Sequence, residues 1–385
     1  MKHKHLHVRL PEHMRAWVEV DLDALSHNAK ELKSFLPQGC EMIVVLKADA
    51  YGHGHEKCAL RLQRDGIKNF AVATATEGVQ LRKCGITGNI LVLGYTQPID
   101  AHILEEFSLA QVVVDGVHAK GLNESGYALN VHVGIDTGMH RLGIEHSKLE
   151  EIESVFNYPN LKVVGMATHL ASSDSTDESD IEFTNLQLSR LTKVVETLKE
   201  KGYNVGKVHA QASYGIINYS ESNFDYARAG IMLYGVKSFF GGTKTEPNLQ
   251  PVLSLKANIA QVREIAAGES VGYSRTYTAE KQVKIATVCL GYADGLPRLL
   301  SGKGGKCIVC GKLVPIVGRI SMDMVTIDVT DVPDVSPGDV AIFIGKEGDL
   351  EIRAETIAES IGTIAYEIIS RMGTRPPRLY INDTQ

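Results

Sequence analysis

Eight short apolar segments recur along the first 235 residues of the chain, and helix-like sequence separates most of them. A strand that is buried on both faces reads as a continuous apolar run of this kind. The segments are 41–46, 69–74, 89–94, 110–115, 129–136, 161–169, 206–212 and 225–235. A doubly wound sheet seldom repeats so often, whereas eight strand–helix repeats make a (β/α)8 TIM barrel. We therefore predict an α/β fold with a TIM barrel in this part of the chain.

The pattern changes after about residue 248, where strand-like segments follow one another with glycine turns and little helix between them. These segments are 253–265, 283–291, 306–318, 324–329 and 339–345, and one helix-like stretch, 353–373, follows them. The sequence therefore predicts two domains: an N-terminal barrel over residues 1–248 and a mainly-β C-terminal domain over residues 249–385. The segment 16–25 begins like a strand and fits either domain.

Composition and charge narrow the class of protein. A net charge of -6 argues against a nucleic-acid binder, which would need a basic face, and favours a small polar substrate. No stretch approaches the roughly 18 apolar residues of a membrane span, and no apolar core follows the His-rich start, so we expect a cytoplasmic protein. Cys307 and Cys310 have C-x-x-C spacing, but no second pair completes a zinc site, and we expect no metal.

Polar residues of catalytic type stand where the predicted barrel strands end. Active sites of TIM barrels form at the carboxyl ends of the strands, so these side chains should meet on one rim. They are Lys47 after the first strand, Asp136 and Arg141 after the fifth, His169 ending the sixth, Ser213 after the seventh, and Arg228 and Gly230 in the eighth. This set suits an anionic, electron-withdrawing cofactor whose carbonyl condenses on the lysine.

The loops after strands seven and eight of a barrel commonly bind phosphate. There Ser213 would offer a hydroxyl, Gly230 would let the backbone approach an anion, and Tyr51 could reach across from the first loop. A phosphate site beside a reactive lysine indicates pyridoxal 5'-phosphate, with Lys47 forming the Schiff base. Arg228, if it faces the pyridine nitrogen, would disfavour protonation of the ring, which suits racemisation and suppresses transamination.

Racemisation needs a base on each face of the α-carbon, because a single base tends to return the proton to the side it left. Lys47 can serve one face. The opposite base is expected from the β domain, where "ESVGYSRTYTAE" contains Tyr273 and Tyr277 and "LGYADG" contains Tyr292.

Seven segments together resemble the signature segments of the alanine racemase family in order and spacing, over about residues 16 to 380. They are "VVLKADAYGHG", "IDTGMHRLG", "THLASSDS", "RAGIMLYG", "VGYSRTYTA", "LGYADG" and "GRISMDMVTIDV". The resemblance implies a fold-type III pyridoxal-phosphate enzyme. It also implies a homodimer of barrel plus β domain, in which the partner's β domain completes each active site. The implied activity is two-base racemisation of alanine for cell-wall peptidoglycan.

The resemblance also implies roles for individual residues. Lys47 is similar to the Schiff-base lysine that serves as one base, and Tyr273 of the other subunit to the opposite base. Phosphate contacts are implied for Tyr51, Ser213, Gly230 and Ile231. Arg228 is similar to the residue facing the ring nitrogen and His169 to its hydrogen-bonding neighbour, while Arg141 resembles the residue that orients the cofactor's phenolic oxygen and the substrate carboxylate. Tyr292, Met322 and Asp323 of the partner resemble the entrance and the substrate-side wall.

Three positions depart from the family pattern. The family often has a carbamylated lysine where Gly134 stands, so something else, such as an anion, must hold Arg141. Ala212 replaces a usual asparagine near the cofactor. Thr374 replaces a tyrosine that crowds the substrate side chain, and its smaller, hydroxyl-bearing side chain would leave room for serine. Serine racemases of the vancomycin-resistance type resemble alanine racemases in this way, usually behind a membrane domain.

Alanine is the expected substrate, with serine as the alternative on the same scaffold. A barrel-type decarboxylase with the same cofactor is a further alternative, but such relatives usually supply a cysteine and acidic residues for diamine or diamino-acid substrates. A non-catalytic, single-barrel cofactor-binding protein would lack the β domain and Tyr273, which this sequence contains.

Overall fold

The computed structural model of the chain describes residues 14–239 and 242–383. The chain divides into two compact units. The barrel unit comprises residues 25–233 and 242–249 of the described chain, and the β unit comprises residues 14–24, 234–239 and 250–383. The His-rich start of the sequence lies outside the described residues.

Eight parallel strands close into a barrel, as predicted. In chain order they are β2 (Glu41–Val45), β3 (Asn69–Val72), β4 (Asn89–Val92), β5 (Leu109–Val113), β6 (Leu129–Asp136), β8 (Leu161–Ala167), β9 (Lys207–His209) and β10 (Tyr226–Ala229). The pairing of β5 with β6 closes the ring, and a short strand, β7 (Ile144–Glu145), adds to β6. The last predicted segment is only half strand, because the 3-10 helix η2 (Ile231–Tyr234) follows β10.

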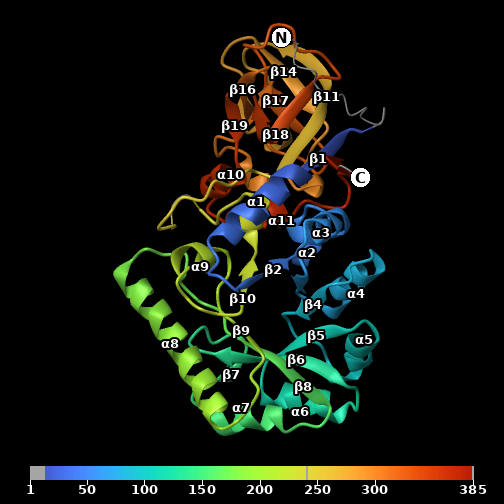
Figure 1. Cartoon of the computed structure of the whole chain (residues 1–385). Coiled ribbons are helices and arrows are strands. Elements are labelled where there is room, and N and C mark those ends of the chain that lie inside the picture. Colours follow the sequence, from blue (N-terminus) through green and yellow to red (C-terminus); the bar gives the residue numbers. More distant parts are fainter. Residues whose placement is uncertain (1–13, 240–241, 384–385) are drawn as a thin grey trace, which may run out of the picture. The chain divides into compact units, whose positions relative to one another are not determined.

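Helices lie outside the barrel strands (Figure 1). They are α3 (His55–Arg64), α4 (Ala75–Lys83), α5 (Ala101–Glu106), α6 (Gly116–Glu124), α7 (Leu149–Phe156), α8 (Glu178–Glu200) and α9 (Ser213–Asn218), with the 3-10 turn η1 (Pro98–Asp100) before α5. Helix α8 buries Leu191, Val195 and Leu198 at helical spacing. It ends before Gly202, whose φ of 87° is the left-handed conformation that glycine adopts without strain.

The β unit is built on one long strand, β11 (Leu253–Ile265). It pairs with β14 (Val283–Val288) and β18 (Val340–Glu347), so that six strands close a ring with β15 (Lys306–Val309), β16 (Lys312–Val317) and β17 (Val325–Asp328). Short edge strands are β19 (Leu350–Ile352) and β20 (Arg378–Ile381). Strand β1 (Ala16–Asp21) pairs with β11 and β20, so this segment, which fits either domain by sequence, lies in the β unit. Helix α1 (Leu22–Ser34) follows β1.

The C-terminal helix-like stretch of the sequence is two helices rather than one, α10 (Ala354–Ile361) and α11 (Ala365–Ser370). Gly362 ends α10 with a left-handed φ of 74°. A left-handed glycine terminates a helix, so the apolar periodicity on both sides of it belongs to separate elements.

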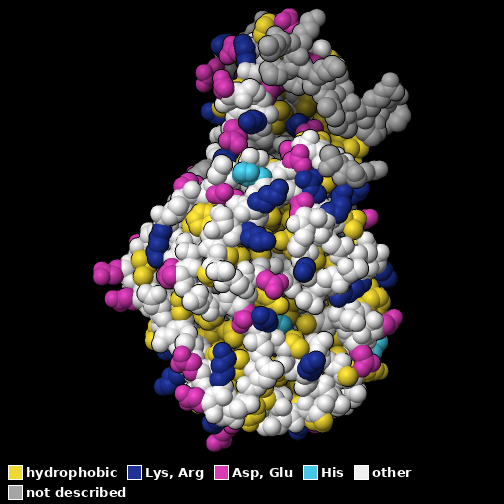
Figure 2. Space-filling model, viewed as in Figure 1, with side chains coloured by type: hydrophobic (Ala, Val, Ile, Leu, Met, Phe, Trp, Pro, Cys, Tyr) yellow, Lys and Arg dark blue, Asp and Glu magenta, His cyan; other side chains and the backbone are white. Residues whose placement is uncertain are grey.

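Acidic and basic side chains are interspersed on the face of the molecule that Figure 2 shows. Among the described residues, no helix combines the length and the apolar character that a membrane span requires.

Candidate functional site

Lys47 stands at the mouth of the barrel, directly after β2, on a left-handed turn labelled α2 (Lys47–Tyr51). Ala48, Asp49, Ala50 and Tyr51 have φ between 52° and 55°. Left-handed backbone is unfavourable for L-residues with a side chain, so other groups must stabilise this turn. The sequence does not predict a left-handed turn here, because none of the four residues is glycine.

Two groups from neighbouring helices support the turn. Glu77 of α4 accepts a hydrogen bond from the Ala48 amide at 2.7 Å. Asp49 accepts one from the His55 amide at 2.9 Å, and the His55 ring nitrogen Nδ1 lies 2.6 Å from the same oxygen. The sequence analysis did not identify Glu77 or Asp49 as site residues. In the structure, His53 is fully buried and His55 is the first residue of α3.

Burial and nearby positive charge both act on the Lys47 amine. Burial, followed by repulsion from Arg141 and Arg228, lowers the pKa of Lys47 below its ordinary value, although Glu77 opposes the shift. A lower pKa means that a larger fraction of the amine is neutral and nucleophilic near neutral pH. The rim residues predicted from strand order therefore influence one another electrostatically, as one site requires.

Three polar groups lie close together in the barrel unit and make a candidate anion site: Tyr51, Ser213 and Gly230. Ser213, the first residue of α9, accepts a hydrogen bond from the Gly230 amide at 2.9 Å. A Cβ on Gly230 would lie 3.2 Å from the Tyr51 hydroxyl oxygen and 3.5 Å from Ser213 Oγ. Because Gly230 has no side chain, its backbone lies close to two hydroxyl groups, and hydroxyl groups and backbone of this kind are what a phosphate needs for binding. Ile231 follows Gly230 and is fully buried.

We expect Gly230→Ala to weaken binding of pyridoxal phosphate at least about tenfold, because the added methyl group occupies the space between the two hydroxyl groups. A titration of the purified variant, followed by cofactor absorbance, measures the dissociation constant. A thermal melt of the cofactor-free protein serves as the control for folding. An unchanged dissociation constant would show that phosphate does not bind at this glycine.

Arg228 is a buried cation whose acceptors are all uncharged. Its guanidinium donates to the Thr168 and Ala210 carbonyls at 2.8 and 2.7 Å, and its nitrogens lie 2.5 Å from His209 Nδ1 and 3.2 Å from His169 Nδ1. No carboxylate pairs with it in the described part of the chain. Burial lowers the pKa of Arg228 to about 10, so the group stays charged near neutral pH and its charge remains available to a ligand.

The contacts of Arg228 determine which nitrogens of the surrounding histidines carry protons. Arginine only donates, so His209 Nδ1 accepts and its Nε2 carries a proton that can be donated to His132 Nδ1, 2.9 Å away. Burial, together with repulsion from Arg228, lowers the pKa of His132 to about 4 and that of His169 to about 3. Sequence analysis found His169 but missed His209 and His132, whose only signal was a histidine inside an apolar strand.

Arg141 lies on the loop that follows β6. Asp136, the last residue of β6, holds this loop by hydrogen bonds. The amides of Gly138 and His140 donate to Asp136 Oδ1 at 2.9 and 3.0 Å. These bonds outweigh the opposing effect of burial and lower the pKa of Asp136. Arg141 itself is exposed and makes no hydrogen bond or ion pair with any described residue.

The resemblance implies that family members often have a lysine where Gly134 stands, and the structure leaves no room for such a side chain at this position. A Cβ there would lie 2.5 Å from the Val113 carbonyl oxygen of the adjacent strand. A side chain at this position would therefore force the backbone apart.

Tyr273 and Tyr277 of the β unit differ in their surroundings, which distinguishes two candidates that the sequence left open. Tyr273 is 70% exposed and lies in the turn η3 (Tyr273–Arg275) between β12 (Ser270–Val271) and β13 (Tyr277–Thr278). Ser274 and Arg275 have φ of 60° and 49°. Tyr277 instead packs against a buried apolar cluster that includes Val271. Tyr273 is thus free to meet another molecule, whereas Tyr277 contributes to the core.

The remaining predicted site residues, Tyr292, Met322, Asp323 and Thr374, also lie in the β unit. Tyr292 and Met322 are 42% and 51% exposed. Asp323 is paired with Arg375 at 2.8 Å, which puts it next to the segment that contains the exposed Thr374. The predicted site residues therefore fall into two sets, one in the barrel unit and one in the β unit.

The start of the barrel strands forms a separate cavity of about 280 Å³. Its lining includes Asn69, Asn89, Lys207 and Tyr226, each the first residue of a strand. The amino-terminal end of a TIM barrel does not carry the active site, so this cavity is not part of the lysine site.

No group of side chains suited to a metal ion occurs among residues 14–239 and 242–383. In the predicted C-x-x-C pair, Cys307 is buried in β15 and Cys310 is exposed in the following turn. Ala212 directly precedes α9.

Comparison with known proteins gives a consistent result. Models of the alanine racemase N-terminal and C-terminal domains match residues 20–238 and 252–380. An amino-acid racemase of Enterococcus faecalis is 42% identical over 94% of this chain and 51% of its own length. An alanine racemase of Carboxydothermus hydrogenoformans is 38% identical over 95% of this chain and 99% of its own length. This chain thus spans about half the length of the Enterococcus relatives and nearly all of the other.

Solved structures have the same fold. The alanine racemase of Bacillus anthracis with bound L-Ala-P superposes with a TM-score of 0.90 at 33% identity, covering 98% of this chain and 97% of its own. The alanine racemase of Clostridium difficile 630 gives a TM-score of 0.90 at 32% identity, covering 96% and 97%.

Proposed function

Because this chain belongs to the alanine racemase family, we propose that it is a pyridoxal-phosphate-dependent racemase that interconverts L- and D-alanine. The observation that carries the proposal is the lowered pKa of Lys47 in a barrel mouth that also contains the anion site and the buried charge of Arg228. When bound, pyridoxal phosphate withdraws electrons from the α-carbon of an amino acid joined to it, which makes the proton on that carbon removable.

The residues of the barrel unit fit this cofactor. Tyr51, Ser213 and the backbone of Gly230 and Ile231 would hold the phosphate, and Lys47 would bind the carbonyl carbon. Arg228 would face the ring nitrogen, where its positive charge keeps a proton off that nitrogen. Arg141, which has no protein partner among the described residues, is left to orient an anionic group such as the substrate carboxylate.

Two bases would move the proton. Lys47 Nζ takes or returns it on one face of the α-carbon, and the hydroxyl of Tyr273 does so on the other, because one base alone favours return to the original face. His169 stays neutral through its pKa of about 3 and supports Arg228. Both enantiomers are then reached from one deprotonated state.

We propose that the protein acts as a cytoplasmic homodimer in which Tyr273, Tyr292, Met322 and Asp323 of one subunit face Lys47 of the other. The exposure of Tyr273 on a turn with left-handed residues supports this arrangement, because it leaves the tyrosine hydroxyl accessible to a second subunit. The family's supply of D-alanine for cell-wall precursors is the proposed role.

The direct test is an assay of the purified chain with pyridoxal phosphate and L-alanine or L-serine, with the D-products separated by chiral chromatography. Formation of D-alanine at a useful rate is expected. A chain that binds the cofactor but racemises neither amino acid would refute the proposal.

Serine is a second candidate substrate, because the small, exposed Thr374 stands where family members often have tyrosine. The Enterococcus relatives are named amino-acid racemases, without a stated substrate. A threonine would leave space and a hydrogen-bond partner for the serine hydroxyl.

We expect Thr374→Tyr to lower kcat/KM for serine about tenfold more than kcat/KM for alanine, because the ring fills the space and removes the small hydroxyl group. Steady-state kinetics with both amino acids measure the ratio. Thr374→Ser is the matched control, since it keeps a small hydroxyl and should leave the ratio nearly unchanged. Equal losses for serine and alanine in the tyrosine variant would remove Thr374 from substrate selection.

A further inference from the structure

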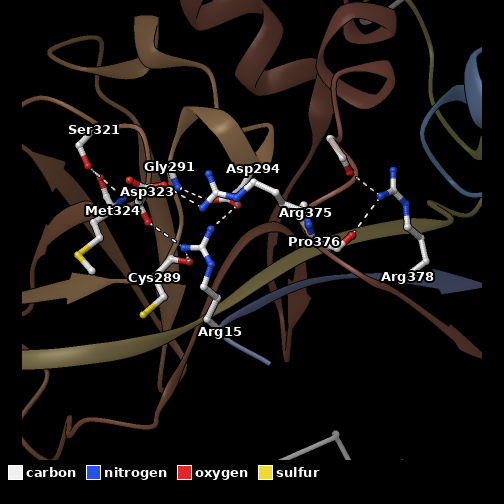
Figure 3. Close-up of polar contacts among 11 residues, drawn as sticks. Arg15, Cys289, Gly291, Asp294, Ser321, Asp323, Met324, Arg375, Pro376 and Arg378 are labelled. Carbon is white, nitrogen blue, oxygen red and sulfur yellow. Dashed lines mark hydrogen bonds and ion pairs between the residues drawn. The ribbon is translucent and has the colours of Figure 1, made fainter. Parts of the chain in front are cut away.

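Separate stretches of the β unit meet at one buried carboxylate, that of Asp294. It lies in the turn η4 (Tyr292–Asp294), and its side chain is 1% exposed. Arg15 Nη2 lies 2.5 Å from Asp294 Oδ1, and Arg375 Nε lies 3.3 Å from the same oxygen. The Gly291 amide donates to Oδ2 at 2.9 Å. Figure 3 shows both guanidinium groups directed at this carboxylate.

Each of the two arginines also binds the loop at residues 321–324. Arg375 Nη2 donates to Asp323 Oδ1 at 2.8 Å. Arg15 Nη1 donates to the Asp323 carbonyl oxygen at 3.1 Å and to the Cys289 carbonyl oxygen at the same distance. Asp294 is therefore linked through both arginines to the backbone and side chain of Asp323.

The backbone of the 291–295 turn is packed closely on both sides. A Cβ on Gly291 would lie 2.3 Å from the Met322 carbonyl oxygen, and the Ala293 amide donates to that oxygen at 3.0 Å. On the other side, a Cβ on Gly373 would lie 3.1 Å from the Ala293 carbonyl oxygen. The turn thus touches both the 321–324 loop and the segment that leads to Thr374.

Burial makes Asp294 the most consequential charge of this group. Its partners are partly exposed, with side-chain exposures of 37% for Arg15, 41% for Arg375 and 55% for Asp323. Pairs between exposed charges contribute little, whereas the loss of one partner from a buried pair leaves an uncompensated group. The arrangement of the three segments therefore depends mainly on the Asp294 carboxylate.

We propose that Asp294 is a positioning residue for amino-acid binding, which holds Tyr292, Asp323 and Thr374 in one arrangement through Arg15 and Arg375. This inference rests on the proposed function, because it takes those three residues as the wall of the substrate site. Asp294 is buried and acts only through the residues that it positions.

The test compares Asp294→Asn with Glu355→Gln in the cofactor-loaded full chain. Glu355 is the matched control because it is also 1% exposed and paired with an arginine, Arg353, at 2.9 Å. Among the described residues, Glu355 makes no hydrogen bond or ion pair with the Asp294 group. The measurements are amide hydrogen exchange of peptides covering residues 371–378 and steady-state kinetics with alanine.

For Asp294→Asn we expect amide exchange of residues 371–378 to become at least about tenfold faster. We also expect KM for alanine to rise about tenfold with kcat changed less than about twofold, because the wall binds substrate but does not transfer the proton. Glu355→Gln should lower the melting temperature about as much as Asp294→Asn does. It should change neither the amide exchange of residues 371–378 nor KM for alanine.

Normal exchange and KM in Asp294→Asn, or an equal KM rise in Glu355→Gln, would overturn the inference. If Asp294→Asn does not fold, Arg375→Gln breaks the same link from a more exposed position and carries the same expectations. A wild-type chain without racemase activity would refute the proposed function, whereas the exchange comparison would still decide whether Asp294 holds the segment.

Discussion

Lys47→Ala is expected to abolish racemisation and the visible absorbance of bound pyridoxal phosphate. The burial of the lysine and the repulsion from Arg141 and Arg228 lower the pKa of its amine. Loss of both a covalent attachment and a base removes more than one contribution to catalysis, so the residual rate should fall by at least about 10³-fold. Absorbance spectra and a racemisation assay measure the two effects.

Lys199→Ala is the matched control for this prediction. Lys199 is an exposed lysine in the last turn of α8, so its removal should leave both spectrum and rate unchanged. Full activity in Lys47→Ala would show that another amine carries the reaction and would refute the assignment.

Tyr273→Phe is expected to lower the racemisation rate by about 10²- to 10⁴-fold, the range typical of a lost general acid–base group. The cofactor absorbance should persist, because the residues proposed to bind the cofactor belong to the barrel unit. Tyr277→Phe is the matched control, since that ring packs against the apolar cluster around Val271 and its hydroxyl has no proposed role. Unchanged rates from both enantiomers in Tyr273→Phe would contradict the two-base scheme.

The same two variants test whether active sites are shared between subunits. In a mixed dimer, one subunit carries Lys47→Ala and the other carries Tyr273→Phe. One active site then has both bases, Lys47 from the second subunit and Tyr273 from the first. Random exchange of subunits should then return about a quarter of the wild-type rate, because half of the dimers are mixed and each has one complete site. No recovery in a mixture shown to contain mixed dimers would mean that both bases come from one subunit.

Much of the fold could be predicted because each strand is recognised from a short, continuous stretch of sequence. Each barrel strand is a short apolar run, and a closed parallel barrel brings the ends of all eight strands to one rim, so strand order alone grouped Lys47, His169 and Arg228. The break at Gly362 was missed because apolar periodicity continues across it, although the glycine itself was a visible signal.

The unpredicted parts of the site depend on contacts between residues that are distant in sequence. His209 became part of the site only because Arg228, on the next strand, turns toward it. Likewise, the buried carboxylate of Asp294 is paired with Arg15 and Arg375, which are 279 and 81 positions away in the sequence. The residues adjacent to them in the sequence do not predict such contacts.

The left-handed turn after Lys47 depends on contacts with other elements of the barrel unit. Each L-residue in it is less stable there than in a right-handed helix by about 1–2 kcal/mol, so the segment does not adopt this shape by itself. Glu77, which accepts a hydrogen bond from the Ala48 amide, belongs to α4, and α4 packs on β3 and β4. The shape of the turn that begins at Lys47 thus depends on tertiary contact, so cofactor capture by Lys47 reports that this part of the barrel is folded.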